Sequence, residues 1–358
     1  MKYWIALFCL YQVFLVTETN AQEVTSDIID VFQQKDLPVA SCYRIPSVIS
    51  TTTDLLIVAV DERIGSCADL NKNQDINIVI RKSADQGTNW SEIERIVDYP
   101  FGESASDPSM ILDRQRGTLL LFFNYMNHKE EPGVYQIKMI KSMDHGKTWT
   151  QPMDITSQIT EAEWKKDFMF LTSGQGFQDT EGNMYHTLVH LKYGVFVILS
   201  KDGGNTWQRI STPLNPADES KIVVLKQGTW LINSRANQVG YRFEHRSDDQ
   251  GKTWITKPST QLIDSGCNAG FEYLLPDASR PQGLLLFTNP RSSTTRENLS
   301  LQWSYDKGST WPGLKTIYTG SAAYSTTVQL NQSSIGIVFE RDQYSTISFI
   351  KIPRSTFD

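Results

Sequence analysis

An eight-residue motif, Ser-x-Asp-x-Gly-x-Thr-Trp, recurs along this 358-residue chain and constrains the fold more than any other feature. Four copies match it fully, and the first copy along the chain has Asn89 where the others have Thr. The copies begin 59, 58, 47 and 57 residues apart and occupy residues 83–90, 142–149, 200–207, 247–254 and 304–311. A unit that recurs at such a spacing is typical of a repeat architecture.

The residue types of the motif are those of a tight turn. The Asp carboxylate can accept hydrogen bonds from nearby backbone N–H groups, and Gly adopts a positive φ at little cost. Apolar or β-branched runs precede the motif, as at residues 78–80 and 196–199. The closing Trp is large enough to fill a gap between two adjacent sheets. Each copy therefore predicts a β-hairpin with an aromatic anchor.

The segments between the motifs also favour strands. Loops rich in Gly, Pro, Asn, Asp and Ser separate short apolar runs, for example residues 55–60, 118–123, 221–225, 230–232, 283–287 and 335–339. The nearest approach to a helix is residues 159–170, and no Pro/Ser/Gly-rich linker divides the chain. We predict one all-β domain over residues 22–358, a six-bladed β-propeller with four antiparallel strands in each blade.

The first 21 residues differ from the rest. Lys2 precedes an apolar run over residues 3–16, and small residues suited to cleavage follow up to Ala21. This pattern predicts a secretory signal peptide over residues 1–21 rather than a membrane anchor, because the run is too short to span a bilayer. We therefore expect export, to the medium, the periplasm or an organelle lumen, with no stable membrane anchor.

The net charge and the residue content argue against several classes of protein. A formal net charge of −6, without a basic run, argues against a nucleic-acid partner. Beyond residue 21 only Cys42, Cys67 and Cys267 remain, too few and odd in number for a disulfide scaffold. Cys42 and Cys67 could form a disulfide or stay as buried thiols, and the sequence leaves both open. The five histidines show no metal-ligand grouping, so no metal site is expected.

Two motifs together resemble a known family. Ser-x-Asp-x-Gly-x-Thr-Trp resembles the Asp box, and residues 43–46, Tyr-Arg-Ile-Pro, resemble the motif that opens the catalytic domain of sialidases (exo-α-neuraminidases). Asp boxes also occur in propellers that are not sialidases, such as sortilin-like receptors, so they predict the fold and other residues must indicate the function. The resemblance implies a glycoside hydrolase that acts on sialylated glycoproteins, gangliosides or oligosaccharides without a metal or cofactor.

By resemblance, three arginines bind the substrate carboxylate: Arg44, Arg235 and Arg296. A guanidinium keeps its charge and presents a planar fork to a carboxylate, so three converging arginines would select an anionic sugar. Glu340, at the end of an apolar run, matches the glutamate that orients the first arginine. Taken alone, each arginine would be interpreted as a surface residue and Glu340 as an edge-strand charge.

The catalytic residues that the resemblance implies are Asp69 as acid/base, Tyr324 as nucleophile and Glu219 as its partner base. Arg63 matches an auxiliary arginine near the carboxylate, and Asp107 matches an aspartate on the 4-hydroxyl side of the sugar. Residues 172–176 resemble a Gly-rich loop at the pocket mouth. Without the resemblance, the two aspartates would be interpreted as turn residues, Tyr324 as buried packing and Glu219 as a loop carboxylate.

These roles imply a retaining mechanism with a covalent sialyl-tyrosine intermediate. A trans-sialidase or intramolecular trans-sialidase of the same fold is an alternative, but residues 292–295 before Arg296 contain no aromatic residue to stack an acceptor sugar. A non-catalytic sialic-acid-binding propeller is a further alternative. It would be expected to lose Tyr324, Glu219 or Asp69, and this chain has all three.

Overall fold

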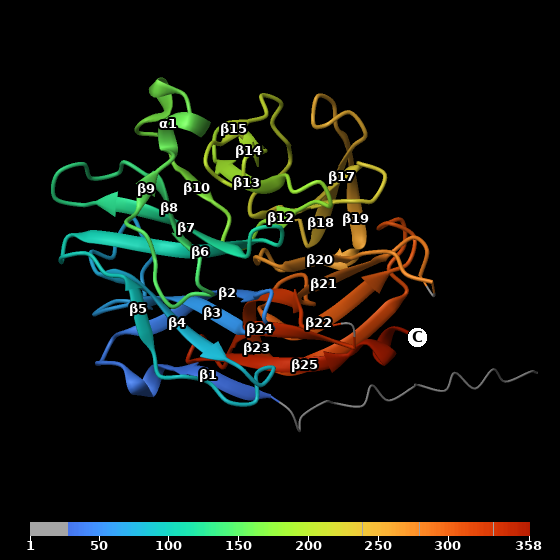
Figure 1. The fold of residues 1–358 in the computed structure, drawn as a ribbon, viewed down its shortest axis with the longest axis horizontal. Helices are drawn as coiled ribbons and strands as arrows, with labels where there is room; N and C mark the ends of the chain where they lie inside the picture. The colour runs from blue at the N-terminus through green and yellow to red at the C-terminus, as the bar shows by residue number, and fades with distance from the viewer. Residues whose placement is uncertain (1–27, 238, 279, 332) are drawn as a thin grey trace, which may run out of the picture.

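The computed structural model describes residues 28–358 except residues 238, 279 and 332, and it is built almost entirely of β-strands (Figure 1). The predicted signal peptide, residues 1–21, lies outside the described residues. The described strands form five sheets, and all strand pairs are antiparallel except one short parallel pair. The all-β prediction is confirmed. No helix in the described part of the chain is long and apolar enough to cross a bilayer.

Two sheets have four strands. One contains β2 (Cys42–Ser50), β3 (Leu56–Arg63), β4 (Ile76–Ser83) and β5 (Glu94–Val97). The other contains β16 (Ser220–Val224), β17 (Trp230–Ser234), β18 (Tyr241–Ser247) and β19 (Ile255–Ile263). In both, strands that follow one another in the chain lie side by side, as expected when each connection is a hairpin.

Two further sheets have five strands, because short segments of the 169–178 region join them. One contains β11 (Gly174–Gln175), β6 (Glu103–Asp113), β7 (Thr118–Asn127), β8 (Gln136–Ser142) and β9 (Met153–Asp154). The other contains β10 (Met169–Leu171), β12 (Phe177–Gln178), β13 (Met184–His190), β14 (Gly194–Ser200) and β15 (Gln208–Arg209). The parallel pair joins β11 to β6, so this region connects two neighbouring sheets.

The fifth sheet has seven strands because one strand is shared by two groups. It contains β20 (Gly270–Leu274), β21 (Leu284–Pro290), β22 (Glu297–Ser304), β23 (Gly313–Gln329), β24 (Ser334–Arg341), β25 (Thr346–Pro353) and β1 (Ile29–Gln33). Residues 313–321 of β23 pair with β22, whereas residues 322–329 pair with β24. The N-terminal strand β1 pairs with the C-terminal strand β25, which brings the two ends of the described chain into one sheet.

The innermost strands contact one another in sequence. Strand β2 contacts β6, β6 contacts β12, β13 contacts β16, β16 contacts β20, β20 contacts β23, and β23 returns to β2. Buried apolar side chains form six clusters. Five lie between neighbouring sheets, and one lies between the two groups of strands in the seven-stranded sheet. Polar side chains at the starts of the inner strands are therefore brought toward a common centre.

The repeated motif has one place in every sheet that carries it. Its Ser is the last residue of β4, β8, β14, β18 or β22, so each motif forms the turn that ends the third strand of its group. In the second copy, Ser142 Oγ donates to Asp144 Oδ1 (2.8 Å), and Thr148 donates from N (2.9 Å) and Oγ1 (2.6 Å) to the same carboxylate. Asn89 replaces Thr in the first copy by donating from N (2.9 Å) and Nδ2 (2.7 Å) to Asp85.

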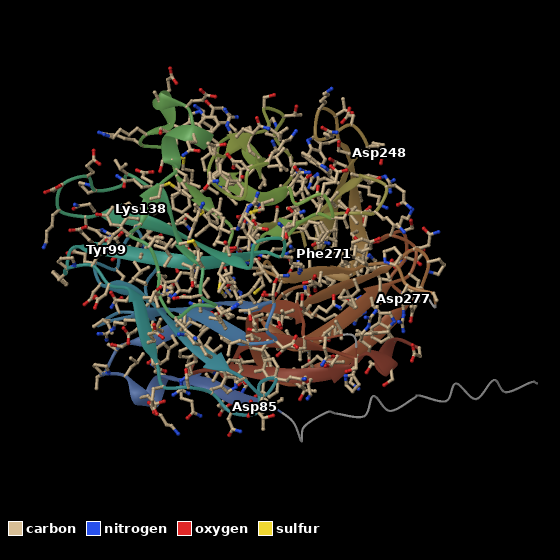
Figure 2. All side chains as sticks on the ribbon, viewed as in Figure 1. Asp85, Tyr99, Lys138, Asp248, Phe271 and Asp277 are labelled. Atoms are coloured by element: carbon tan, nitrogen blue, oxygen red, sulfur yellow. A yellow bond between two sulfur atoms is a disulfide. The ribbon has the colours of Figure 1, made fainter. Side chains whose placement is uncertain are left out.

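The motif Gly and Trp connect the turn to a neighbouring sheet. Gly87 has φ +91°, and a Cβ there would lie 2.1 Å from the ring of Phe349 in β25. The ring centroids of Trp90 and Phe349 are 5.6 Å apart, and those of Trp207 and Phe122, in β7, are 5.2 Å apart. The predicted aromatic anchor between sheets is confirmed. Figure 2 shows Asp85 at the periphery of the molecule and Phe271, from an inner strand, near its middle.

The helical tendency of residues 159–170 is not realised as a helix of that length. The structure has one turn of α-helix, α1 (Thr156–Ile159), and a 3₁₀ turn over Ala162–Trp164, followed by strand β10. Two other 3₁₀ turns occupy Gln34–Asp36 and Arg354–Phe357. Ile159 and Trp164 are buried against the two five-stranded sheets, so tertiary packing overrides the local preference for a helix.

Candidate active site

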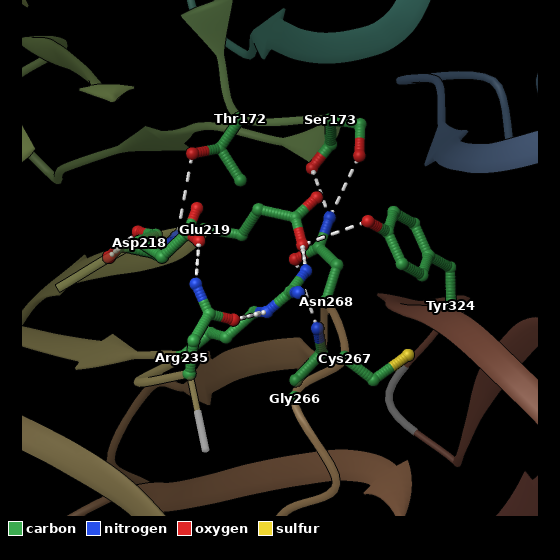
Figure 3. Close-up of polar contacts among 12 residues, drawn as sticks. Thr172, Ser173, Asp218, Glu219, Arg235, Gly266, Cys267, Asn268 and Tyr324 are labelled. Atoms are coloured by element: carbon green, nitrogen blue, oxygen red, sulfur yellow. Dashed lines mark hydrogen bonds and ion pairs between the residues drawn. The ribbon is translucent and has the colours of Figure 1, made fainter. Parts of the chain in front are cut away.

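Tyr324 and Glu219 are 105 residues apart in the chain and meet beside two inner strands. Tyr324 lies where β23 begins to pair with β24, and Glu219 immediately precedes β16. The Tyr324 hydroxyl donates a hydrogen bond to Glu219 Oε2 at 2.9 Å (Figure 3). The Glu219 side chain is only 5% exposed, so its carboxylate is directed at this partner rather than at solvent.

The three predicted carboxylate-binding arginines gather around Tyr324. Arg235, directly after β17, donates from Nη1 to Glu219 Oε2 at 2.6 Å and from Nε to Asn237 Oδ1 at 2.7 Å (Figure 3). The guanidinium carbons of Arg44 and Arg296 lie 5.9 and 5.6 Å from the centroid of the Tyr324 ring. Residues separated by up to 252 positions (296 − 44) thus surround one phenol.

Glu340 compensates the positive charge of Arg44. Its carboxylate is fully buried and accepts from Arg44 Nε at 2.7 Å and Nη2 at 3.4 Å. It also accepts from the backbone N–H groups of Ile45 (2.9 Å) and Tyr324 (3.1 Å). A buried carboxylate needs such partners, since an unpaired charge inside the protein is very costly. Glu340 therefore joins the arginine to the nucleophile candidate, and the edge-strand alternative is wrong.

Asp69 lies at the exposed edge of the same group. Its carboxylate is 81% exposed and accepts from Arg63 Nη1 at 2.8 Å. Arg63, at the end of β3, is almost fully buried and also donates from Nε (3.1 Å) and Nη2 (2.9 Å) to Asp61. Asp61 in turn accepts from Ser106 Oγ (2.7 Å) and Asp107 N (2.8 Å). Asp61 thus fixes both Arg63 and the backbone of Asp107, which has φ +61° at the bulge in β6.

Burial and charge shift the acidity of these groups in different directions. Burial, assisted by the Glu219 carboxylate, raises the pKa of Tyr324 well above its usual range. Burial likewise raises the pKa of Glu219, against the opposing effect of Arg235. Burial and then the neighbouring Asp61 raise the pKa of Asp107 to about 7. For Asp69, burial acts in the same direction but Arg63 outweighs it, so the pKa is lowered.

Several residues of the site were not predicted from the sequence. The Tyr344 ring lies over Arg44, 4.1 Å from its guanidinium carbon, and its hydroxyl accepts from Arg296 Nη1 at 3.2 Å. Lys221 lies in β16, two residues after Glu219, and is buried. Its amine nitrogen donates to Ser173 O and to Asn268 Oδ1 (3.2 Å). Burial lowers the pKa of Lys221 to about 7, against the effect of Glu219. The only signal in the sequence was an alternation that put Lys221 on the same strand face as Glu219.

One loop is placed differently from the prediction. Thr172 and Ser173 are buried, and Gly174 is paired to β6 through β11, so residues 172–176 do not form a rim at the pocket mouth. The Thr172 hydroxyl accepts from Ser220 N at 3.4 Å, and Asn268 Nδ2 donates to Ser173 Oγ at 2.8 Å (Figure 3). This segment supports the floor of the site from below.

The cysteines are now assigned. Cys42 and Cys67 form a disulfide, and Cys67 O accepts from Arg63 Nη1 at 3.0 Å, so the bond ties the Asp69 loop to β2. Cys267 is a buried free thiol beside Gly266. Among the described residues, no three His, Cys, Asp or Glu side chains are grouped as a metal site would require.

One cavity in the described structure lies away from this site. It has a volume of about 820 Å³ and is lined by the far ends of the inner strands, including Ser50, Leu112, Val224 and Val328. None of the predicted site residues lines this cavity. We assign the candidate active site from the converging charged groups, because size alone does not provide chemistry.

Comparison with known proteins agrees with this arrangement. Residues 66–337, more than half of the chain, match the BNR repeat-like domain family. The sequence is 30% identical to the sialidase of Micromonospora viridifaciens over 329 residues, which cover 83% of this chain and 50% of that protein. The chain belongs to the sialidase family. It is 25% identical to the sialidase of Bacteroides fragilis strain YCH46 over 331 residues, 84% of this chain and 60% of that protein.

The chain therefore spans about half to three-fifths of the length of these two curated relatives. A solved structure with the same fold is the leech intramolecular trans-sialidase complexed with 2,7-anhydro-Neu5Ac, with a TM-score of 0.78 and 17% identity. That match covers 93% of this chain and 71% of the leech chain.

Proposed function

We propose that this member of the sialidase family is an exo-α-sialidase, a retaining glycoside hydrolase that removes terminal α-linked sialic acid from sialylated glycans. The observation that carries the proposal is the hydrogen bond from Tyr324 to Glu219, with Arg44 and Arg296 beside the same ring. A phenol paired with a buried carboxylate is a nucleophile with its own base. The arginines supply the positive charge that an acidic sugar requires.

In the proposed complex, Arg44, Arg235 and Arg296 bind the sugar carboxylate. Glu340 and Glu219 already neutralise two of these arginines in part, so the pocket does not hold three uncompensated charges. An entering carboxylate adds charge-assisted hydrogen bonds to guanidinium groups that are held in place beforehand. Asp107, with a pKa of about 7, can donate or accept a hydrogen bond near the sugar hydroxyls around neutral pH.

The choice of a tyrosine nucleophile follows from electrostatics. The anomeric carbon of sialic acid bears a carboxylate, which would repel an anionic nucleophile at a few ångströms. A neutral phenol avoids this repulsion, and Glu219 takes its proton as the bond to the anomeric carbon forms. The raised pKa of Tyr324 keeps the hydroxyl neutral until substrate binds.

The glycosidic bond breaks as the bond to Tyr324 forms, and its oxygen leaves with the proton of Asp69. Asp69 then takes a proton from water as the water attacks the anomeric carbon, and the Tyr324 oxygen leaves and recovers its proton from Glu219. Sialic acid is released with retained configuration.

Asp69 must hold a proton when it acts as general acid on the glycosidic oxygen. In the structure without substrate, Arg63 lowers its pKa, and Arg44 and Arg296 act in the same direction. A bound substrate carboxylate would offset the charge of these arginines and so raise the pKa of Asp69. Its exposure leaves room for the leaving group to approach.

A transferase is the second candidate, because the leech protein of the same fold is named an intramolecular trans-sialidase. The absence of an aromatic residue at positions 292–295 favours hydrolysis. A non-catalytic sialic-acid-binding protein would not need a base hydrogen-bonded to a phenol.

We further propose a six-bladed propeller with four strands in each blade. Support comes from the closed series of contacts among inner strands and from the division of β23 between two groups of partners. We also propose export directed by residues 1–21. The Cys42–Cys67 disulfide is in keeping with an oxidising compartment.

The decisive experiment measures hydrolysis of a fluorogenic α-sialoside by the wild type and by Tyr324→Phe, with products identified by mass spectrometry. We expect free sialic acid from the wild type and at least about a thousandfold lower kcat for Tyr324→Phe. Tyr193→Phe, at an exposed tyrosine whose ring packs against Trp164 and His190, is the matched control. An anhydro sugar or a sialylated acceptor as product would establish the transferase instead, and near-normal turnover by Tyr324→Phe would refute the mechanism.

A further inference from the structure

The turn between β24 and β25 has an unusual backbone. Asp342, Gln343 and Tyr344 have φ values of 52°, 56° and 70°, so three consecutive residues other than glycine adopt the left-handed conformation. Single residues of this type occur in turns, but each costs free energy that surrounding contacts must offset. Such a turn persists only where the rest of the structure fixes it.

The fixing contacts come from the strand that carries Tyr324. Asp342 N donates to Ser321 O at 2.9 Å, and Gln343 N donates to Ser321 Oγ at 3.2 Å. The Asp342 carboxylate accepts from the Tyr318 hydroxyl and from Arg341. Both Tyr318 and Ser321 belong to β23, so the turn is locked to the strand three to six residues before Tyr324.

The result of this conformation is the position of one aromatic ring. Tyr344 lies with its ring 4.1 Å from the guanidinium carbon of Arg44, and its hydroxyl accepts from Arg296 Nη1 at 3.2 Å. Glu340 holds the other side of Arg44, and Gly266 O accepts from Arg296 Nη2 at 3.0 Å. One half-buried side chain thus contacts two of the three arginines.

The chemistry of these contacts leaves both arginines available for a ligand. A ring face attracts a cation without adding a negative charge, and a phenol oxygen accepts one hydrogen bond without neutralising the guanidinium. A carboxylate in the same place would compete with the substrate carboxylate. A neutral group also separates two like charges that would otherwise move apart or bind counterions.

We propose that Tyr344 is a positioning residue for substrate binding, which fixes the relative placement of Arg44 and Arg296 so that both engage one carboxylate. This inference rests on the proposed function. It predicts that the loss of Tyr344 weakens the binding of the carboxylate more than it slows the chemical steps, because neither Tyr324 nor Glu219 contacts its side chain in any described interaction.

The test compares Tyr344→Phe and Tyr344→Leu with the wild type in KM and kcat on the fluorogenic sialoside. Phe keeps the ring over Arg44 and removes the hydroxyl, whereas Leu removes both contacts. We expect KM to rise about threefold for Phe and about tenfold or more for Leu, with kcat changed less than about threefold. Gln343→Ala changes an exposed side chain in the same turn and is the matched control.

A second measurement does not depend on turnover. Calorimetry gives the affinity for N-acetylneuraminic acid and for its methyl ester, in which the carboxylate charge is masked. We expect the preference for the acid over the ester to fall about tenfold in Tyr344→Leu and to stay at the wild-type value in Gln343→Ala.

An unchanged preference in Tyr344→Leu, or an equal loss in Gln343→Ala, would overturn the proposal. If Tyr344→Leu does not fold, the same preference for the acid over the ester is measured in Tyr344→Phe, and an unchanged preference there would overturn the proposal. A wild type that binds the acid but hydrolyses no sialoside would refute the proposed function. The role of Tyr344 in binding would then be decided by the ratio of the affinities for the acid and the ester alone.

Discussion

The Asp-box turns and the central site use the same kind of interaction for opposite purposes. In each box, a carboxylate accepts hydrogen bonds from groups at most four residues away, as at Asp144, and the Asp residue is exposed or only partly buried. In the site, Glu340 accepts from Arg44, 296 residues away, and Glu219 accepts from Tyr324, 105 residues away. The boxes are repeated and local, whereas the site is assembled once from the whole chain.

Their electrostatics differ for the same reason. The backbone N–H and side chain of Asn89 lower the pKa of Asp85 to about 2, because solvent and local donors both favour the ionised form. Burial raises the pKa of Glu219, and the Arg235 guanidinium, which donates to the same carboxylate, opposes this shift. A change of one carboxylate should therefore have local consequences at the periphery and long-range consequences at the centre.

The largest expected effect comes from Glu340→Gln. Loss of the buried charge leaves Arg44 without its ionic partner, and we expect a loss of about 3–5 kcal/mol in the free energy of unfolding. We also expect at least about a hundredfold lower kcat/KM on a sialoside, since the first arginine is no longer held. Chemical denaturation and steady-state kinetics measure the two effects. Glu297→Gln, at an exposed glutamate near Arg296, should change neither, and a stable, active Glu340→Gln would contradict this account.

The double substitution Cys42→Ser and Cys67→Ser should have the next largest effect on stability. The disulfide closes a loop of 25 residues, and its removal should lower the free energy of unfolding by about 3 kcal/mol. Denaturant titration with and without a thiol reductant checks this, because the reductant should destabilise the wild type and leave the double variant unaffected. Equal sensitivity of both proteins would show that this bond does not stabilise the site.

Lys221→Met tests the buried charges of the central site through the pH dependence of stability. The pKa of Lys221 is lowered to about 7 in the folded protein, from an unfolded value of 10.5, so between these pH values the unfolded chain binds more protons. The free energy of unfolding of the wild type, relative to that of Lys221→Met, should therefore increase as the pH rises from 7 toward 10, by about 2 kcal/mol over the first two pH units. Thermal denaturation of both proteins across this range measures the difference. A constant difference would mean that the buried amine does not titrate there.

The smallest effect is expected at an Asp box. Asp306→Asn weakens hydrogen bonds from Ser304 and Thr310 and should lower the free energy of unfolding by about 1 kcal/mol, with kcat/KM unchanged. The same two measurements used for Glu340→Gln provide a direct comparison. A large loss of activity here would show that the boxes contribute to the site, against their peripheral place.

Much of the fold was predictable because its determinants are local. The Ser, Asp, Gly and Trp of each box specify one hairpin turn by contacts within eight residues, and the substitution of Asn89 for Thr preserves the same donors. The shared strand β23 and the pairing of β1 with β25 were not predictable, because they depend on how the sheets meet. The tendency of residues 159–170 toward a helix failed because Ile159 and Trp164 are buried by other sheets.

The nine predicted site residues came from motifs, and the resemblance also implied the pairs Arg44–Glu340 and Tyr324–Glu219, but other contacts of the site were not predicted. Nothing in the sequence indicated that Asp61 holds both Arg63 and Asp107, or that Tyr344 contacts two arginines. The alternatives of a disulfide or free thiols at Cys42 and Cys67 also stayed open until the structure placed the loop of Cys67 beside β2, with the two Cα atoms 5.7 Å apart.

The sequence by itself determined an all-β chain of repeated hairpins and a set of charged and aromatic residues suited to an acidic sugar. Turn chemistry and strand alternation act over a few residues, so they can be inferred from a few residues. Only the tertiary structure decided which guanidinium faces which carboxylate, which groups are buried and how their pKa values shift. These properties depend on distances between residues that are remote in the chain, and burial and Coulomb interactions exist only once the sheets have come together.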